Sequence, residues 1–175
     1  RKKKKGAFYN CFALIIRIFE DQKFREIHIK VFNTGKLEIP GIQKDKTLIY
    51  VLEKLIETLQ PFIKKQLHYD VNNIETVLIN SNFSCNYVID RNKLFDLLKF
   101  KYNIHVLFDP CSYPGIQCKF YYNKNKKIQN GICNCKKKCT SKEKLCSIVS
   151  FMVFRTGSVL IVGHCDESML NIIYK

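Results

Sequence analysis

Four cysteines lie close together in the last third of the chain, in the pattern Cys133-x-Cys135-x3-Cys139-x6-Cys146. Thiolates at such short spacing suit tetrahedral Zn²⁺ or a redox pair. The usual Cys-x2-Cys knuckles are absent, and the neighbouring lysines favour thiolates while repelling a cation. The sequence therefore favours a lysine-rich loop of reduced cysteines and no cofactor, with a zinc ion at these four thiols as the alternative.

The other residue types that carry out catalysis show no organised spacing. No carboxylate cluster or Cys-His pair supplies chemistry here, and the sequence has no glycine-rich phosphate loop. The four histidines are dispersed and lack metal-ligand spacing: His28, His68, His105 and His164. We therefore predict a protein that is not an enzyme.

Charge gives the first indication of a partner. The 175 residues are 46% hydrophobic, enough for one sizeable domain or two small ones. Thirty Lys and Arg against fifteen Asp and Glu leave a net charge of +15, which predicts attraction to polyanions, nucleic acid before membrane. No apolar stretch approaches the roughly 20 residues of a membrane helix. The odd count of nine cysteines favours reduced thiols in an intracellular protein.

The chain contains an internal repeat. Residues 31–41 and 153–163 are identical at six of eleven positions, and each reads as strand, tight turn at Thr-Gly, and strand. A further strand is predicted before each copy, at 8–19 and 115–122. Apolar residues at helical spacing follow each copy, from Leu48 to Leu59 and from Met169 onward. The repeating unit is therefore β-β-β-α.

The second copy also has a predicted strand at 74–86 and a predicted helix at 91–102 before it. The corresponding strand and helix of the first copy would precede Arg1. We predict two half-repeats, an N-terminally truncated one at 1–66 and a second at 67–175. A Lys/Cys-rich insertion at 123–146 fits neither copy.

This pair of units resembles the core of the TATA-binding protein family, whose hairpins carry Phe-x-Ser/Thr-Gly-x3-(Val/Ile)-x-Gly. Residues 80–86, Asn-Ser-Asn-Phe-Ser-Cys-Asn, are similar to the family's Asn-x3-Ser-Cys-Asp strand. Tyr113-Pro114-Gly115 is similar to its Phe-Pro-Gly stirrup. The resemblance covers nearly the whole chain apart from the insertion. The divergence and the residue usage favour a viral factor of the African swine fever virus type.

The resemblance implies an α+β fold, a pseudo-symmetric saddle of curved antiparallel sheet with helices on the convex face and an incomplete first half-repeat. The concave face would bind the DNA minor groove, and aromatic wedges would kink the duplex. By motif position the wedges would be Phe32, Tyr113 and Phe154, with Phe12 as the fourth, although strict register from Arg17 puts Cys11 there.

The resemblance also implies groove and phosphate contacts, and these residues are Asn80, Arg17, Thr34, Lys36, Lys119, Met152, Thr156, Leu160 and Val162. The stirrup residues Asp109, Cys111 and Ser112 would contact a factor-IIB-like partner. Glu38 and Pro40 depart from the family pattern and present a carboxylate toward the groove. This predicts weakened TATA selectivity with retained bending and salt-dependent affinity.

Strand alternation divides the first hairpin into two faces. One carries Lys30, Phe32, Thr34, Lys36, Glu38 and Pro40, and the other, expected beneath helices, carries Ile29, Val31, Leu37 and Ile39. In the second hairpin the expected DNA side is Met152, Phe154, Thr156, Ser158, Leu160 and Val162.

The leading hypothesis is a transcription initiation factor that binds and bends AT-rich, promoter-like double-stranded DNA and recruits RNA polymerase through a factor-IIB-like protein. The alternative is a protein-interaction scaffold of the same fold in a viral transcription complex, without specific DNA binding. An enzyme built on this fold is a third reading. We expect the host cytoplasm as location if the protein is viral, otherwise the nucleus, and no membrane partner.

Overall fold

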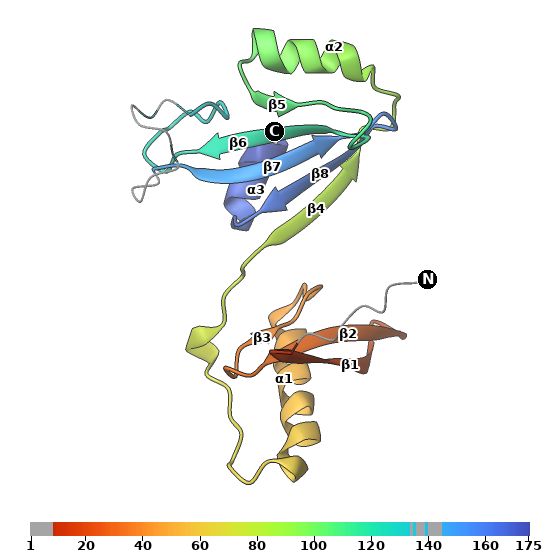
Figure 1. The fold of residues 1–175 in the computed structure, drawn as a ribbon, viewed down its shortest axis with the longest axis vertical. Helices are drawn as coiled ribbons and strands as arrows, with labels where there is room; N and C mark the ends of the chain where they lie inside the picture. Colours follow the sequence, from red (N-terminus) through yellow and green to blue (C-terminus); the bar gives the residue numbers. More distant parts are fainter. Residues whose placement is uncertain (1–8, 134, 136–138, 140–144) are drawn as a thin grey trace. The chain divides into compact units, whose positions relative to one another are not determined.

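The computed structural model describes residues 9–133, 135, 139 and 145–175. The chain divides into two compact units, Arg1–Ile74 (unit 1) and Glu75–Lys175 (unit 2) (Figure 1). The sequence-based boundary was placed after residue 66. Each unit is an antiparallel sheet with helix on it, so the predicted α+β class is confirmed. In the described part of the chain, no helix is long and apolar enough to cross a membrane.

Unit 1 is a three-stranded sheet in the order β1-β2-β3, with α1 on one face (Figure 1). Its elements are β1 (Cys11–Glu20), β2 (Lys23–Phe32), β3 (Leu37–Glu38), α1 (Asp45–Leu59) and the short 3₁₀ turns η1 (Gln60–Phe62) and η2 (Val71–Asn73). Asp21 and Gln22, both at positive φ, form the two-residue turn between β1 and β2. The helix predicted from spacing is confirmed, and Pro61 lies in the turn that follows its end.

The core of unit 1 forms where alternate residues of β1 and β2 meet one stripe of α1. Ile29 and Val51 are completely buried, and Ile18, Ile27 and Leu55 are nearly so. Burying each such side chain contributes about 1.5–3 kcal/mol. Because strand side chains alternate, this burial assigns one face of the sheet to the core and turns the other away from α1.

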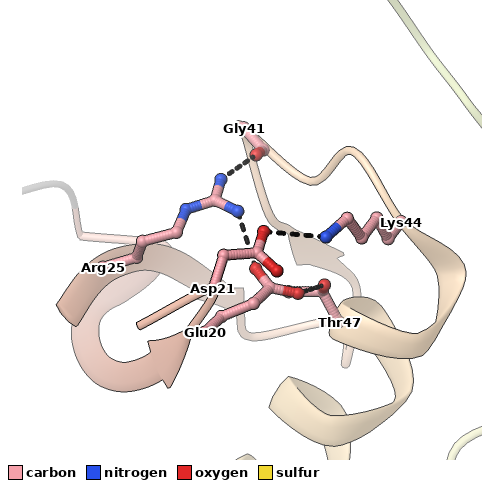
Figure 2. Close-up of polar contacts among 6 residues, drawn as sticks. All are labelled: Glu20, Asp21, Arg25, Gly41, Lys44 and Thr47. Carbon is pink, nitrogen blue, oxygen red and sulfur yellow. Dashed lines mark hydrogen bonds and ion pairs between the residues drawn. The ribbon is translucent and has the colours of Figure 1, made fainter. Parts of the chain in front are cut away.

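A polar network ties the β1–β2 turn to the start of α1. Figure 2 shows its residues, which are Glu20, Asp21, Arg25, Gly41, Lys44 and Thr47. The buried Thr47 hydroxyl donates to Glu20, and the Arg25 guanidinium lies 2.7 Å from the other oxygen of that carboxylate. Lys44 pairs with Asp21 at 2.8 Å. The Thr47 hydrogen bond, with Arg25 beside it, holds the pKa of Glu20 below its ordinary value.

Unit 2 is a five-stranded antiparallel sheet in the order β4-β8-β7-β6-β5 (Figure 1). Its strands are β4 (Ile79–Ser84), β5 (His105–Leu107), β6 (Ile116–Tyr122), β7 (Ser147–Val153) and β8 (Ser158–Gly163). Its helical segments are α2 (Arg91–Asp96), the π-helical turn η3 (Leu97–Lys101) and α3 (Glu167–Tyr174). Asp90 and Asp166 cap α2 and α3 by accepting backbone N–H groups.

One strand prediction in unit 2 needs correction, and one strand of the sheet was not expected. The strand expected over 74–86 runs only from Ile79 to Ser84, because its partner β8 offers six residues and ends at Gly163. The short strand β5 was not predicted. The insertion joins β6 to β7, and part of it, residues 134, 136–138 and 140–144, lies outside the described residues.

The core of unit 2 lies between the sheet and α3. Val149 and Ile116 are completely buried, and Val153 and Ile161 pack with Met169 of α3. Leu94 of α2 packs against the same cluster. Both helices therefore contribute to the core on the same side of the sheet.

The two repeated hairpins have the same local geometry. In each, the phenylalanine amide donates 2.9 Å to the carbonyl four residues on. The turn glycine donates back to that phenylalanine, at 2.9 Å for Gly35 to Phe32 and 3.0 Å for Gly157 to Phe154. Both glycines have φ 84°, a conformation that L side chains rarely adopt. The repeat found in the sequence is thus a repeat of backbone structure.

The two glycines differ in surroundings, which generates a matched prediction. A methyl group at Gly35 would meet nothing within 4 Å, whereas one at Gly157 would collide with the carbonyl oxygen of Tyr87. We expect Gly35→Ala to cost about 1 kcal/mol in unit 1 from backbone strain alone. Gly157→Ala should cost more than about 3 kcal/mol in unit 2. Hydrogen exchange of the β1–β2 and β4–β8 amides measures the two losses separately, and equal losses would contradict the assignment.

The Glu20 network predicts a pH-dependent stability of unit 1. Because the folded pKa of Glu20 is lowered, its stabilisation is complete above the ordinary carboxyl pKa and disappears as the pH falls through the lowered value. Glu20→Gln should therefore destabilise unit 1 at about pH 7 and have little effect once the pH is below the lowered pKa of Glu20. Urea unfolding of both proteins across this range tests the point. The Lys44–Asp21 pair is present in both proteins, so its titration cancels from the difference in unfolding free energy. A difference that stays constant with pH would therefore contradict the role of Glu20.

Candidate nucleic-acid interface

Strand register defines which side chains of unit 2 point away from α3. Asn80 pairs with Val162, Asn82 with Leu160, and Gln117 with Met152 across neighbouring strands, and partners in such pairs share a face. We call this surface the open face of unit 2, and it carries Asn80, Asn82, Gln117, Lys119, Met152, Ser158, Leu160 and Val162. The predicted second-hairpin face is thereby confirmed for Met152, Ser158, Leu160 and Val162.

Two aromatic rings lie together on this face beside the β7–β8 turn. The ring centroids of Tyr113 and Phe154 are 5.8 Å apart at 58°. Gly115, next to the Ile116–Val153 pair, is buried beneath them, and a methyl group there would lie 3.1 Å from each ring. The structure therefore brings together the two residues predicted as wedges of the second half-repeat, and the small Gly115 makes room for both rings.

The stirrup that carries Tyr113 is a tight turn. The Asp109 carboxylate accepts the Ser112 hydroxyl and, at 3.1 Å, the Cys111 amide, and the Tyr113 amide donates 2.9 Å to the Asp109 carbonyl. The Ser112 and Cys111 hydrogen bonds hold the pKa of Asp109 below its ordinary value. Arg91 of α2 donates to the Pro114 carbonyl. The predicted partner residues Asp109, Cys111 and Ser112 thus lie together on one exposed turn.

The face of unit 1 that points away from α1 is defined in the same way. Cys11 pairs with Phe32, Ala13 with Lys30, and Arg17 with Glu26. The open face of unit 1 therefore carries Cys11, Ala13, Ile15, Arg17, Phe19, Phe24, Glu26, His28, Lys30, Phe32 and Glu38. The predicted groove or phosphate residues Thr34 and Lys36 are exposed in its turn, as Thr156 is in the turn of unit 2.

Phe12 does not join Phe32. It pairs with Val31, and side chains in such a pair share the face that packs on α1, so Cys11 occupies the position beside Phe32. The fourth wedge placed at Phe12 is corrected on this ground, because adjacent strand residues point to opposite faces. Unit 1 thus has one ring at this position where unit 2 has two.

The first hairpin separates its faces largely as predicted. Ile29 is buried, and Val31 and Ile39 pack against the core of unit 1, while Leu37 is 36% exposed. Lys30 and Glu38 face each other across β2 and β3, with their charged atoms 3.0 Å apart. The Glu38 carboxylate on the open face is therefore neutralised by its neighbour.

An exposed aromatic cluster lies at the end of β1 and β2 next to the turn that joins them, and it was not predicted from the sequence. The Phe19 and Phe24 rings are 65% and 61% exposed, with centroids 5.0 Å apart. The Arg17 guanidinium lies 4.4 Å from the Phe24 centroid. Counting every second residue from Arg17 would have found Phe19. Such a cation–aromatic group is suited to stacking on a flat partner.

The four clustered cysteines come together in space. Their sulfurs all lie within 4.8 Å of one another, and Cys139 and Cys146 are buried. The Cys139 sulfur is 3.2 Å from that of Cys133 and 3.3 Å from that of Cys135. A hydrogen bond from the Cys135 amide, with others from neighbouring thiols, lowers the pKa of Cys133 to about 7. These four residues could hold a metal ion.

Comparison with known proteins gives a direction. No family model matches the chain. It is 26% identical over 176 aligned positions to a protein of Acanthamoeba polyphaga mimivirus named TATA-box-binding protein-like, an alignment that covers 89% of this chain and 43% of that relative. This similarity supports a TATA-binding-protein-like family. The chain spans less than half of the relative's length.

The α+β architecture, with two antiparallel sheets and three α-helices among the described residues, is consistent with a fold of that kind. On the open face of unit 2, half-buried apolar side chains of β7 and β8 lie beside the amides of Asn80 and Asn82. Such a surface places hydrogen-bond donors beside apolar side chains. It suits a partner that offers acceptors next to apolar surface.

Proposed function

We propose that this protein is a non-enzymatic, TATA-binding-protein-like transcription initiation factor whose open faces bind the minor groove of AT-rich promoter-like DNA and bend it. The observation that carries the proposal is the open face of unit 2, where groove, wedge and phosphate residues predicted from separate motifs share one surface. The similarity to a mimivirus protein supports a viral factor of this kind, and the residue usage favours the African swine fever virus type.

The chemistry of that face matches the minor groove. Asn80 and Asn82 can donate amide hydrogens to the adenine N3 and thymine O2 acceptors, while Met152, Leu160 and Val162 cover the sugar and base edges without demanding polar partners. The minor groove distinguishes A·T from G·C chiefly through the guanine amino group. An apolar surface with few donors would therefore distinguish A·T from G·C pairs. It would not read the order of the A·T pairs.

The wedge residues would supply the bend. Tyr113 and Phe154 together present two rings where a base step would open, whereas Phe32 has the small Cys11 beside it. Insertion of apolar side chains between base steps costs a few kcal/mol of unstacking and is offset by contact with the bent duplex. We therefore expect the sharper kink at the unit 2 end.

Backbone contacts would supply affinity without sequence reading. Arg17 and Lys119 lie on the open faces and Lys36 in an exposed turn, within a chain of net charge +15. Each phosphate contact adds about 0.9 to the slope of log affinity against log salt. The Lys30–Glu38 pair reduces this attraction on unit 1.

The stirrup turn would contact a factor-IIB-like partner through Asp109, Cys111 and Ser112, and through it RNA polymerase. The second candidate function is a protein-interaction scaffold in a viral transcription complex. The exposed Phe19–Phe24 pair favours it, because an exposed apolar patch suits a protein surface, and the Glu38 carboxylate would not oppose a protein partner as it would a phosphate.

Removing the wedges tests the bending. Fluorescence energy transfer between the ends of a short AT-rich duplex, compared with a GC-rich duplex, measures affinity and bend together. We expect Phe154→Ala to lose more of the bend than Phe32→Ala, and the double variant to lose nearly all of it. Each stacked ring is worth about 1–3 kcal/mol, so binding should weaken by about tenfold per ring.

Phe62→Ala with Phe100→Ala is the matched control, since these phenylalanines are 84% and 69% exposed in helical turns off the sheets. The control should bend DNA like the unchanged protein. Binding without any bend, or no binding to either duplex with partner capture retained, would favour the scaffold.

Removing the carboxylate that pairs with Lys30 tests whether the open face of unit 1 contacts DNA phosphates. Glu38→Gln removes the carboxylate, so affinity should rise by about threefold to tenfold and the salt slope by about 0.9. Glu57→Gln makes the same charge change on α1, where Glu57 pairs with Lys54 at 2.6 Å, and should have a smaller effect. Equal effects of the two variants would mean that only total charge matters and that this face does not contact DNA.

A further inference from the structure

The geometry of the clustered cysteines matches a four-ligand tetrahedral site. Zinc–thiolate bonds of about 2.3 Å place the sulfurs of a regular tetrahedron about 3.8 Å apart. Here three sulfur pairs lie at 3.2, 3.3 and 3.6 Å, and all four atoms are within 4.8 Å of one another. The sulfurs therefore need to move by only a few tenths of an ångström to about one ångström to enclose one ion.

The sulfur positions do not resolve into two disulfide pairs. Cys139 is as close to Cys135 as to Cys133, at 3.3 and 3.2 Å, and Cys135 is also 3.6 Å from Cys146. A disulfide needs a single partner at about 2.05 Å. A set of near-equal distances is what a shared central atom requires.

The sheet fixes two of the ligands in advance. Cys146 directly precedes β7, and Cys133 follows Gly131 by two residues. The Gly131 carbonyl accepts the Tyr121 amide at 3.0 Å, and a methyl group at Gly131 would lie 2.9 Å from the Phe120 ring, so this backbone lies tightly against β6. The last ligand thus directly precedes a strand and the first lies two residues after a backbone hydrogen bond to the neighbouring strand, which lowers the entropic cost of closing the site.

The lysines that neighbour the four cysteines in the sequence favour the loaded form. Four thiolates and one divalent cation carry a net charge of −2, and residues 123–146 contain eight lysines and one glutamate. The lysines repel a free zinc cation, but they attract the negatively charged complex that forms once the thiols have lost their protons. Thiolate ligands select a soft or borderline metal, and four of them without an open position are typical of structural zinc.

We propose that Cys133, Cys135, Cys139 and Cys146 bind one Zn²⁺ ion in a structural site that closes the β6–β7 connection of unit 2. Binding releases the thiol protons to solvent and involves no redox change. The site has a role in folding this connection and takes no part in chemistry. It stands independently of the DNA-binding proposal, because no open-face residue is among its ligands.

The test uses the full chain, purified under reducing conditions with Zn²⁺ supplied and then dialysed. Elemental analysis should find one zinc per chain. Replacement by Co²⁺ should give the intense visible bands of tetrahedral cobalt with the ultraviolet charge-transfer absorption of four thiolates. A chain that retains no metal, or a cobalt spectrum without thiolate charge transfer, would overturn the proposal, as would an intact mass that shows hydrogen lost from paired thiols under these conditions.

Cys133→Ser with Cys139→Ser removes two ligands, and zinc affinity should fall by more than about 100-fold, since loss of even an outer-shell partner costs 10–100-fold. Cys111→Ser changes an exposed thiol outside the cluster and should keep one zinc per chain. Circular dichroism shows whether the double variant remains folded. If the variant is unfolded, the cobalt spectrum of the unchanged chain alone tests whether the four thiolates bind the metal. Full zinc retention in a folded double variant would place the metal elsewhere.

Discussion

Both units depend on one constraint, the burial of every second strand residue beneath a helix. Ile29 meets Val51 in the core of unit 1, and Val149 and Ile161 pack toward α3 in unit 2. Because the side-chain period of a strand is two, a slip of one residue would expose these side chains and bury Arg17 or Asn80 instead. The loss of several completely buried aliphatic side chains, at about 1.5–3 kcal/mol each, makes such a slip prohibitive. The same apolar residues that stabilise each unit thereby determine which side chains the open faces present.

The repeated turn extends this constraint to the aromatic residues. In both hairpins the phenylalanine lies two residues before a Thr-Gly pair, at the end of β2 for Phe32 and directly after β7 for Phe154, and its amide and carbonyl are both bonded within the turn. The backbone at Phe32 and Phe154 is therefore fixed on both sides. The surroundings differ, since Gly157 lies against the Tyr87 carbonyl while Gly35 is in open space. In unit 2 the backbone of Tyr87 therefore also contacts the hairpin turn. The second ring of unit 2, Tyr113, comes from a separate turn that the hydrogen bonds of Asp109 close.

Local signals explain what could be predicted from the sequence. The hairpins, α1 and the faces of β7 and β8 follow from period and turn residues within about a dozen positions. The length of β4 could not be predicted, because it is set by the six residues of β8, far away in sequence. The Asp21-Gln22 turn lacks the glycine that usually marks a two-residue hairpin, so the alternation through Phe19 and Phe24 was not followed. The position of Cys11 beside Phe32 follows from alternation counted from Arg17, and the pairing of β1 with β2 decides for it against Phe12.

The two open faces carry different chemistry, and this difference indicates how the proposed function would be divided. Unit 2 offers amides, apolar side chains and two rings, which under the proposed function would distinguish a deformable A·T-rich step from a stiffer one. Unit 1 offers Arg17 on an exposed aromatic pair and a lysine partly neutralised by Glu38, groups that stack or contact backbone but read no base edge. A chain with such an asymmetry would orient itself on DNA through unit 2 and gain salt-dependent affinity through unit 1. Its sequence selectivity would then depend mainly on where the duplex bends most easily.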